Sequence, residues 1–279
     1  MIKINSILYL VVFSFLISCS SYEKYEKNKV FYNDPEIFHE SMQKLTDVIV
    51  YDIFSPPVAS RIYVYPTIAA YEILINQHPN FKSLSGKLKG LDKIPLPDPD
   101  LEYSFPLASI HAFLEVGKDL IFSEEKITDF QNEIMSELKE LGIPNEIYNR
   151  SIDYADIVAS HIRKWYKKDN YDQTRSFPKY TIRRNNIESW KPTPPDYMEG
   201  IEPHWNKIRT LLIDSADQFT VDQPPNFSLE KDSHFYKDLY EVYQIGKNLT
   251  DEQKQIASFW DCNPYVSHHK GHAMFATKK

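Results

Sequence analysis

The sequence predicts an all-α fold, a helical bundle with long loops that are rich in proline and aromatic residues. Three observations favour this class. Apolar residues recur at helical spacing in several long stretches. Most of these stretches are bounded by residues that start or stop helices. No stretch of useful length alternates apolar and polar residues as a half-buried strand would, and no repeat of fixed period is present.

The first residues have the layout of a secretory signal. Lys3 is the single charge before an apolar run from Ile7 to Ile17, which is shorter than the roughly 20 residues that a membrane-spanning helix needs. The run ends in Leu16-Ile17-Ser18-Cys19, which resembles the lipobox of bacterial lipoproteins. We therefore expect residues 1–18 to be a lipoprotein signal peptide and Cys19 to be lipidated.

An acyl group on Cys19 would make membrane lipid a partner of this chain. Residues 19–32 are then expected to be a lipidated tether, flexible because its sequence is polar. The residue after the cysteine is Ser20 and not aspartate, so nothing argues for retention in the inner membrane. The expected location is the bacterial cell envelope, at the outer membrane, on its periplasmic or surface face.

The first two predicted helices follow the tether. Asp34 and Pro35 start the first one, with a capping side chain and a proline at the first helical position. A Ser-Pro-Pro sequence ends it. The second helix covers about residues 58–76 and is apolar on most sides, so we expect it to be buried. Pro66 should kink or divide it.

Helical spacing then returns in three stretches, 104–122, 123–141 and 145–168. Residues 169–203 form a long loop whose tyrosines and tryptophans argue for order. A short helix at 203–212 and a longer one at 232–246 are expected after it. Thr250 and Gln253 have the spacing of a capping box, which opens a last helix.

Composition and charge exclude some functions. The chain has 32 basic and 39 acidic residues, a net charge of −7, and no basic run, so nucleic acid is not an expected partner. Its seven glycines form no phosphate-binding loop. Cys262 is the one cysteine besides Cys19, so we expect no intrachain disulfide.

Four segments together resemble the helical vanadium-dependent haloperoxidases of the type 2 phosphatidic acid phosphatase superfamily. They follow one another through most of the chain: Ser55–Glu72, Lys167–Thr181, Ser189–Trp205 and Ile256–Lys279. They match the helical half that supports the family's catalytic bundle. The resemblance implies that residues 33–279 are the N-terminal helical region of a haloperoxidase- or phosphatase-like domain, an incomplete version of that fold.

The family's chemistry needs a cage of lysine, arginine and histidine donors around phosphate or vanadate. Complete members oxidise halide with vanadate and peroxide, or hydrolyse phosphate esters. The cage motifs (K-x6-RP, a PSGH-like turn and SR-x5-H) follow the matched segments in the family, and none is complete in this chain. The resemblance therefore implies a truncated chain that has no catalytic residue, holds no cofactor and is inactive alone. A separately encoded C-terminal fragment is a candidate partner.

Two partial patterns supply candidate site residues. Lys168 and Arg175 have the spacing of the first cage motif, with Ser176 in place of its proline, and are the candidate oxyanion-binding residues. His268 and His272 lie four residues apart, so on a helix they would share one face and are the candidate metal ligands. No third ligand accompanies them.

The aromatic residues of the long loop suggest a second class of function. Five of them could stack on sugar rings: Tyr171, Tyr180, Trp190, Tyr197 and Trp205. The alternative hypothesis is a helical surface lipoprotein that binds a glycan or another nutrient. The competing interpretation, which the sequence favours, is that these aromatics pack the loop onto the helices.

The resemblance also predicts an uncovered apolar surface. Residues that would face the missing bundle include Phe259, Trp260, Met274 and Phe275. We expect an exposed apolar patch at this end of the chain, with low stability or aggregation.

Overall fold

The computed structural model describes residues 22–194, 197 and 199–260. All regular secondary structure in these residues is helical, which confirms the all-α prediction. The helices are residues 22–32, α2 (Pro35–Tyr51), α3 (Pro56–Leu74), η1 (Ile75–Gln77), α4 (Phe105–Lys118), α5 (Glu124–Glu140), α6 (Asn145–Tyr166), α7 (Tyr171–Thr174), η2 (Trp205–Lys207), α8 (His234–Lys247) and α9 (Asp251–Phe259).

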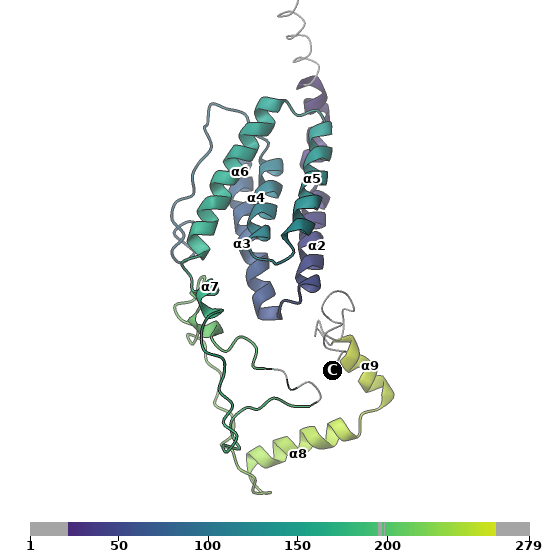
Figure 1. The fold of residues 1–279 in the computed structure, drawn as a ribbon, viewed down its shortest axis with the longest axis vertical. Coiled ribbons are helices and arrows are strands. Elements are labelled where there is room, and N and C mark those ends of the chain that lie inside the picture. The colour runs from purple at the N-terminus through teal and green to yellow at the C-terminus, as the bar shows by residue number, and fades with distance from the viewer. Residues whose placement is uncertain (1–21, 195–196, 198, 261–279) are drawn as a thin grey trace, which may run out of the picture.

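Helices α2 to α6 form the bundle that holds the core (Figure 1). Helix α4 lies at its centre and contacts α2, α3, α5 and α6. Its residues Leu107, Phe113 and Leu114 are fully buried. This burial of apolar side chains is the main favourable contribution to the stability of the bundle.

The helix boundaries follow the predicted caps closely. Asp34 accepts a hydrogen bond from the Glu36 amide at 3.0 Å, with Pro35 at the first helical position. Thr250 and Gln253 form the predicted capping box of α9, with distances of 3.2 and 2.9 Å. Both caps satisfy amide groups that a helix leaves without an internal partner.

Helix α3 continues through Pro66, so the predicted division at this proline is wrong. Pro66 is buried and removes one internal hydrogen bond. The helix is apolar on several sides, as predicted, and packs against α4 and α6. Tertiary packing therefore keeps the helix in one piece despite the missing bond.

The predicted flexible tether is, from residue 22, a helix packed on the bundle, so that prediction is wrong for residues 22–32. Tyr25 and Tyr32 are buried, and the Tyr32 hydroxyl donates to the Leu138 carbonyl at 2.7 Å. Lys24 and Asn28 donate to carbonyls just beyond, at the end of α5. Although the segment is polar in composition, one face of this helix contacts the end of α5 through Lys24, Asn28 and Tyr32.

The loop between η1 and α4 is tied to the segment after η2 and to α6. The Lys89 amide donates to the Leu211 carbonyl at 3.0 Å, and the Trp165 indole donates to the Lys89 carbonyl at 2.9 Å. The predicted helix at 203–212 is reduced to the single turn η2. Bonds between loops replace helical bonds in this segment.

Residues 217–260, which we call the arm, extend away from the bundle and carry α8 and α9 (Figure 1). Neither helix has a buried residue. Phe259 is 80% exposed and Trp260 is 71% exposed, as predicted, whereas Met274 and Phe275 lie outside the described residues. None of the helices in the described part of the chain is long and apolar enough to cross a membrane.

Candidate functional site

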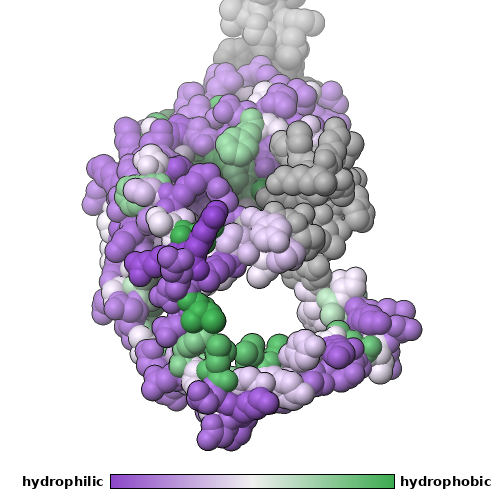
Figure 2. All heavy atoms as spheres, turned by 60° about the horizontal axis from the view of Figure 1, so that its bottom comes forward, coloured by the Kyte–Doolittle hydropathy of each residue, from purple (hydrophilic) through white to green (hydrophobic). Residues whose placement is uncertain are grey.

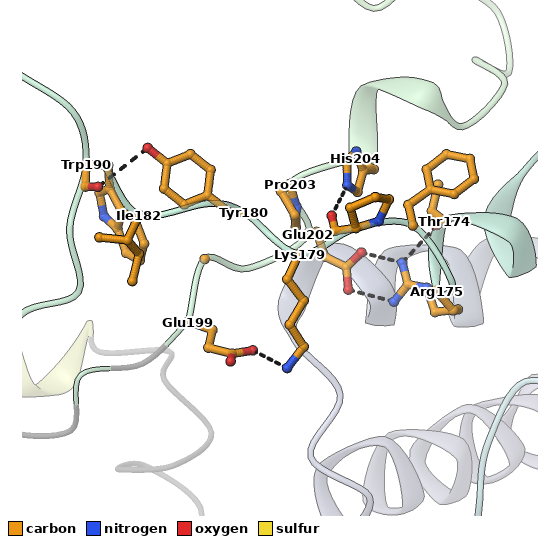
Figure 3. Close-up of a pocket in the computed structure, with 13 residues that line it drawn as sticks. Thr174, Arg175, Lys179, Tyr180, Ile182, Trp190, Glu199, Glu202, Pro203 and His204 are labelled. Carbon is orange, nitrogen blue, oxygen red and sulfur yellow. Dashed lines mark hydrogen bonds and ion pairs between the residues drawn. The ribbon is translucent and has the colours of Figure 1, made fainter. Parts of the chain in front are cut away.

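The long aromatic loop folds around an open cavity of about 260 Å³, whose lining residues are drawn in Figure 3. The cavity is lined by the end of α7 and by two stretches of the loop. The lining residues are Thr174, Arg175, Phe177, Pro178, Lys179, Tyr180, Ile182, Trp190, Glu199, Gly200, Glu202, Pro203 and His204. We call it the loop cavity.

Charged residues line the loop cavity in pairs. Both terminal nitrogens of Arg175 contact the carboxylate of Glu202, one of them at 2.6 Å, a two-point arrangement that fixes the guanidinium. Lys179 contacts Glu199 at 2.8 Å near the solvent. The two cations are matched by two carboxylates, so the cavity offers donors and acceptors without a net positive charge.

Aromatic rings form the remaining walls of the loop cavity. Tyr180 and Trp190 meet edge to face, with ring centroids 5.5 Å apart. Phe177 meets the ring of His204 in the same way at 5.3 Å. The Nε2 nitrogen of His204 lies 2.6 Å from the Pro178 carbonyl oxygen and donates to it, so the proton is on Nε2.

A buried polar cluster holds the start of the loop against the bundle. Asp169, almost fully buried, accepts hydrogen bonds from the Tyr65 hydroxyl and, at 2.9 Å, from the Tyr171 amide. The Arg61 guanidinium lies 3.8 Å from the same carboxylate. Burial raises the pKa of Asp169 above its usual value, and its bond from Tyr65 and the charge of Arg61 oppose that shift.

Arg61 and Arg209 donate hydrogen bonds within this structural cluster. Arg61 donates to the Tyr65 hydroxyl and to the Arg209 carbonyl, both at 3.2 Å. Arg209 donates to the Trp165 carbonyl at 3.1 Å and lies over the Trp165 ring. A second cavity, of about 680 Å³, opens between Arg61, Trp205 and the apolar residues of 208–216.

Comparison with solved structures finds a protein with a similar helical arrangement. The crystal structure of a bacterial vanadium-dependent iodoperoxidase matches it with a TM-score of 0.79 and 46% sequence identity, over 84% of this chain. The match supports a vanadium haloperoxidase-like relationship for this chain. It spans 57% of the length of the iodoperoxidase chain. No protein-family model matches the sequence, and no curated protein matches it.

The haloperoxidase-like chain does not bring its two candidate oxyanion residues together. Arg175 lines the loop cavity and is bound to Glu202. Lys168 is exposed and is not among the residues that line this cavity. The candidate metal ligands His268 and His272, and the predicted lipidation site Cys19, lie outside the described residues.

The predicted sugar-stacking aromatics of the haloperoxidase-like chain lie in four different places. Tyr180 and Trp190 line the loop cavity. Tyr171 is buried against Tyr65, and Trp205 lines the second cavity. Tyr197 is exposed and belongs to neither cavity. The packing interpretation therefore holds for Tyr171, whereas Tyr180 and Trp190 are placed to contact a ligand.

The cations that line the loop cavity and the second cavity are not arranged as a vanadate or phosphate cage. Such a cage needs several cationic donors directed at one point. Arg175, Lys179 and Arg61, the cationic residues of the two cavities described above, each contact a carboxylate instead. Among the described residues no group of three or more His, Cys, Asp or Glu side chains could hold a metal ion.

Sequence reasoning missed the residues that organise this part of the haloperoxidase-like chain. Glu202 pairs with Arg175, and Asp169 lies beside Arg61. Neither carboxylate belongs to a local sequence motif. Asp169 and Tyr65 are 104 residues apart in the chain. Only the folded structure places them in contact.

Proposed function

We propose that this chain is the helical support region of a vanadium haloperoxidase-like envelope lipoprotein, and that alone it binds no tetrahedral oxyanion. The observation that carries the proposal is the pairing of Arg175 with Glu202 and of Arg61 with Asp169. A carboxylate that holds a guanidinium competes with an incoming anion and repels it.

The relative and the sequence resemblance support a proposal for the activity of the whole protein. The relative is a vanadium-dependent iodoperoxidase. A protein that contains this region together with a complete cage would oxidise halide with vanadate and peroxide, or hydrolyse phosphate esters. The role of the present residues is to hold loops such as 169–212 in a fixed position beside that cage.

Vanadate binding by the purified chain tests this function. Residues 20–279 should show no uptake of vanadate in equilibrium dialysis, no iodide oxidation with peroxide, and no hydrolysis of p-nitrophenyl phosphate. The iodoperoxidase relative, measured in parallel, is the positive control. Vanadate uptake by the wild-type chain that is lost in Arg175→Ala or Lys168→Ala would contradict the proposal and restore these residues as oxyanion ligands.

The lipid anchor is a separate part of the proposal. The support is the apolar run that ends at Cys19. Expressed in a bacterium with its signal, the wild-type chain should enter the detergent phase and carry acyl groups on its first peptide in mass spectrometry. Cys19→Ala should abolish both results, and fractionation of the envelope should place the wild-type chain in the outer membrane. An unmodified Cys19 in the mature wild-type chain would refute the anchor.

A second candidate function, sugar binding, is favoured by the Tyr180–Trp190 pair on the wall of the loop cavity. The cavity lies just below the range of about 300–1,000 Å³ that holds drug-sized ligands, so it suits one sugar ring. Saturation-transfer NMR with a panel of monosaccharides should show contacts that Trp190→Ala removes. Tyr197→Ala, on the same loop but outside the cavity, should leave them intact. Equal signals in both variants would exclude this site.

A further inference from the structure

The bundle contains a third cavity, of about 310 Å³, where α4 packs against α5 and α6. We call it the bundle cavity, and it shares no lining residue with the two cavities described above. Apolar side chains gather along the arm in Figure 2, whereas hydrophilic side chains cover most of the rest of that view. The wall of the bundle cavity is also rich in polar side chains, among them His111, Glu115, Lys118, Gln131 and Asp153. Polar groups therefore decide what this cavity can bind.

Three donor side chains of the bundle cavity are bonded to the protein itself. The Lys118 ammonium donates to Glu115 Oε1 at 2.6 Å, and His111 Nε2 donates to the Asp156 carboxylate at 2.9 Å. Gln131 Nε2 donates to His111 Nδ1 and to Glu115 Oε1, both at 3.0 Å. The opposite orientation of this amide would direct its oxygen at the Glu115 carboxylate, which repels it. An anion that entered the cavity would compete with carboxylates for these donors.

Acceptor atoms of the same wall remain available. Both hydrogen bonds to Glu115 end on Oε1, so Oε2 accepts none from the described residues. Gln131 is 5% exposed, and within the described part of the chain nothing donates to its oxygen, Oε1. Asp153 adds a second carboxylate, which is exposed. Since buried polar atoms in proteins normally have a hydrogen-bond partner, the free acceptor of Gln131 indicates an occupant that donates.

The charge of the wall favours a cation. Burial acts to raise the pKa of Glu115, but the hydrogen bonds from Lys118 and Gln131 outweigh it, so this pKa lies below its usual value. Glu115 is therefore ionised at neutral pH. Together with Asp153 it gives the wall two carboxylates against the one ammonium group of Lys118. Such a wall attracts a positively charged ligand.

We infer that the bundle cavity binds a small organic ammonium ion. The ammonium group donates hydrogen bonds to Glu115 Oε2 and Gln131 Oε1, and the exposed Asp153 adds attraction. The alkyl part of the ion contacts Met135 and Ile152, two apolar side chains of the wall. The volume lies at the lower end of the range of about 300–1,000 Å³ for small-molecule sites, so the cavity suits an amine with a short alkyl chain. Because these residues lie outside the loop cavity, this site does not depend on the proposed function.

Three probes with the same alkyl chain and different charge test this site. Pentylammonium, pentan-1-ol and pentanoate are titrated separately into the purified wild-type chain at neutral pH, and binding is measured by saturation-transfer NMR and isothermal calorimetry. We expect pentylammonium to bind at least about tenfold more tightly than pentan-1-ol, because hydrogen bonds between charged groups are stronger than neutral ones. Pentanoate should show no binding.

Variants assign the binding to the bundle cavity. Glu115→Gln should weaken pentylammonium binding at least about tenfold. Asp153→Asn, which removes an exposed charge and no hydrogen bond between described residues, should weaken it about two- to fivefold. The matched control is Glu133→Gln on α5, because Glu133 is exposed and lines none of the three cavities. Circular dichroism checks that each variant is folded, and Asp153→Asn tests the site even where Glu115→Gln loses stability.

Four results would overturn the inference. They are equal affinities of the wild-type chain for pentylammonium and pentan-1-ol, binding of pentanoate in place of pentylammonium, no detectable binding of any probe, and equal pentylammonium binding by Asp153→Asn, Glu115→Gln and Glu133→Gln. Equal affinities would mean that the alkyl chain alone is recognised. Equal binding by the variants would place the amine elsewhere on the molecule.

Discussion

At the scale of single residues, Asp169 connects the segment that leads into the loop cavity with the bundle. Its side chain accepts bonds from Tyr65 on α3 and from the Tyr171 amide, and its carbonyl accepts the Arg209 amide at 2.8 Å. The carboxylate of Asp169 therefore connects the bundle with the start of the loop, and its backbone carbonyl holds the return of the loop. Removing a partner from such a network leaves buried groups unsatisfied.

Asp169→Asn should change how stability depends on pH. Burial raises the pKa of Asp169 above the usual 3.8, so the folded state binds more protons than the unfolded state above that pH. Its contribution to the free energy of unfolding is fully present below about pH 3.8 and is lost as the pH rises through the folded pKa. Urea unfolding measures the free energy of unfolding of the wild type and of the variant. The wild-type value minus the variant value should decrease as the pH rises above about 3.8.

The control for this measurement is Asp172→Asn, three residues further on and exposed. Because this side chain is exposed, the variant controls for the replacement of a carboxylate by an amide near the same point of the chain. A difference between wild type and Asp169→Asn that is constant with pH would show that the carboxylate titrates as it does in the unfolded chain.

A second buried aspartate controls the start of α5. Asp52 accepts hydrogen bonds from the Phe122 amide at 2.8 Å, the Ser123 amide at 3.0 Å and the Ser123 hydroxyl at 2.6 Å. Asp52→Ala should lower the free energy of unfolding by about 2–3 kcal/mol, because these donors lose a charged acceptor. Denaturant melts would measure this. Asp47→Ala, exposed on the same helix α2, should cost less than about 0.5 kcal/mol.

At the scale of whole elements, the helix over residues 22–32 acts as a clamp on the end of α5. Tyr32→Ala should lower the free energy of unfolding by about 3 kcal/mol, since it removes a buried ring and the hydroxyl that caps Leu138. Thermal unfolding followed by circular dichroism is the measurement. Lys27→Ala, whose ion pair with Glu23 is exposed, should have almost no effect. Equal melting temperatures of the two variants would contradict this role and support a flexible tether instead.

The elements that the sequence predicted well depend on local signals. The caps at Asp34 and Thr250 act within a few residues, and the helical spacing of α6 is contained in its own sequence. The elements that it missed depend on distant partners. Residues 22–32 are helical because Tyr32 reaches Leu138, more than 100 residues away, and the 203–212 segment bonds to the loop at Lys89.

The candidate site was predictable only in its composition. Arg175 and Trp190 were recognised in advance as chemically capable, one for anions and one for sugar rings. Whether a cation is available depends on its partner, and Glu202 lies 27 residues from Arg175. No rule of sequence spacing identifies that pair, because the loop between them has no regular periodicity.

At the scale of the whole molecule, buried tyrosines make the stability of the fold depend on pH in the alkaline range. Burial raises the pKa of Tyr32, Tyr154 and Tyr171 to about 12. Their contribution to stability is fully present below about pH 10 and is lost as the pH approaches 12. Phenolate absorbance should thus rise in two phases, the second coinciding with loss of helical circular dichroism. A single phase with intact helices would contradict this.

The position of the helix over residues 22–32 has one more consequence. It begins at one pole of the elongated molecule, whereas α8 lies at the opposite pole (Figure 1). If Cys19 carries acyl chains, the bilayer lies beside the pole where this helix begins, and the exposed apolar residues of α8, such as Leu239 and Val242, lie at the end of the molecule away from the bilayer.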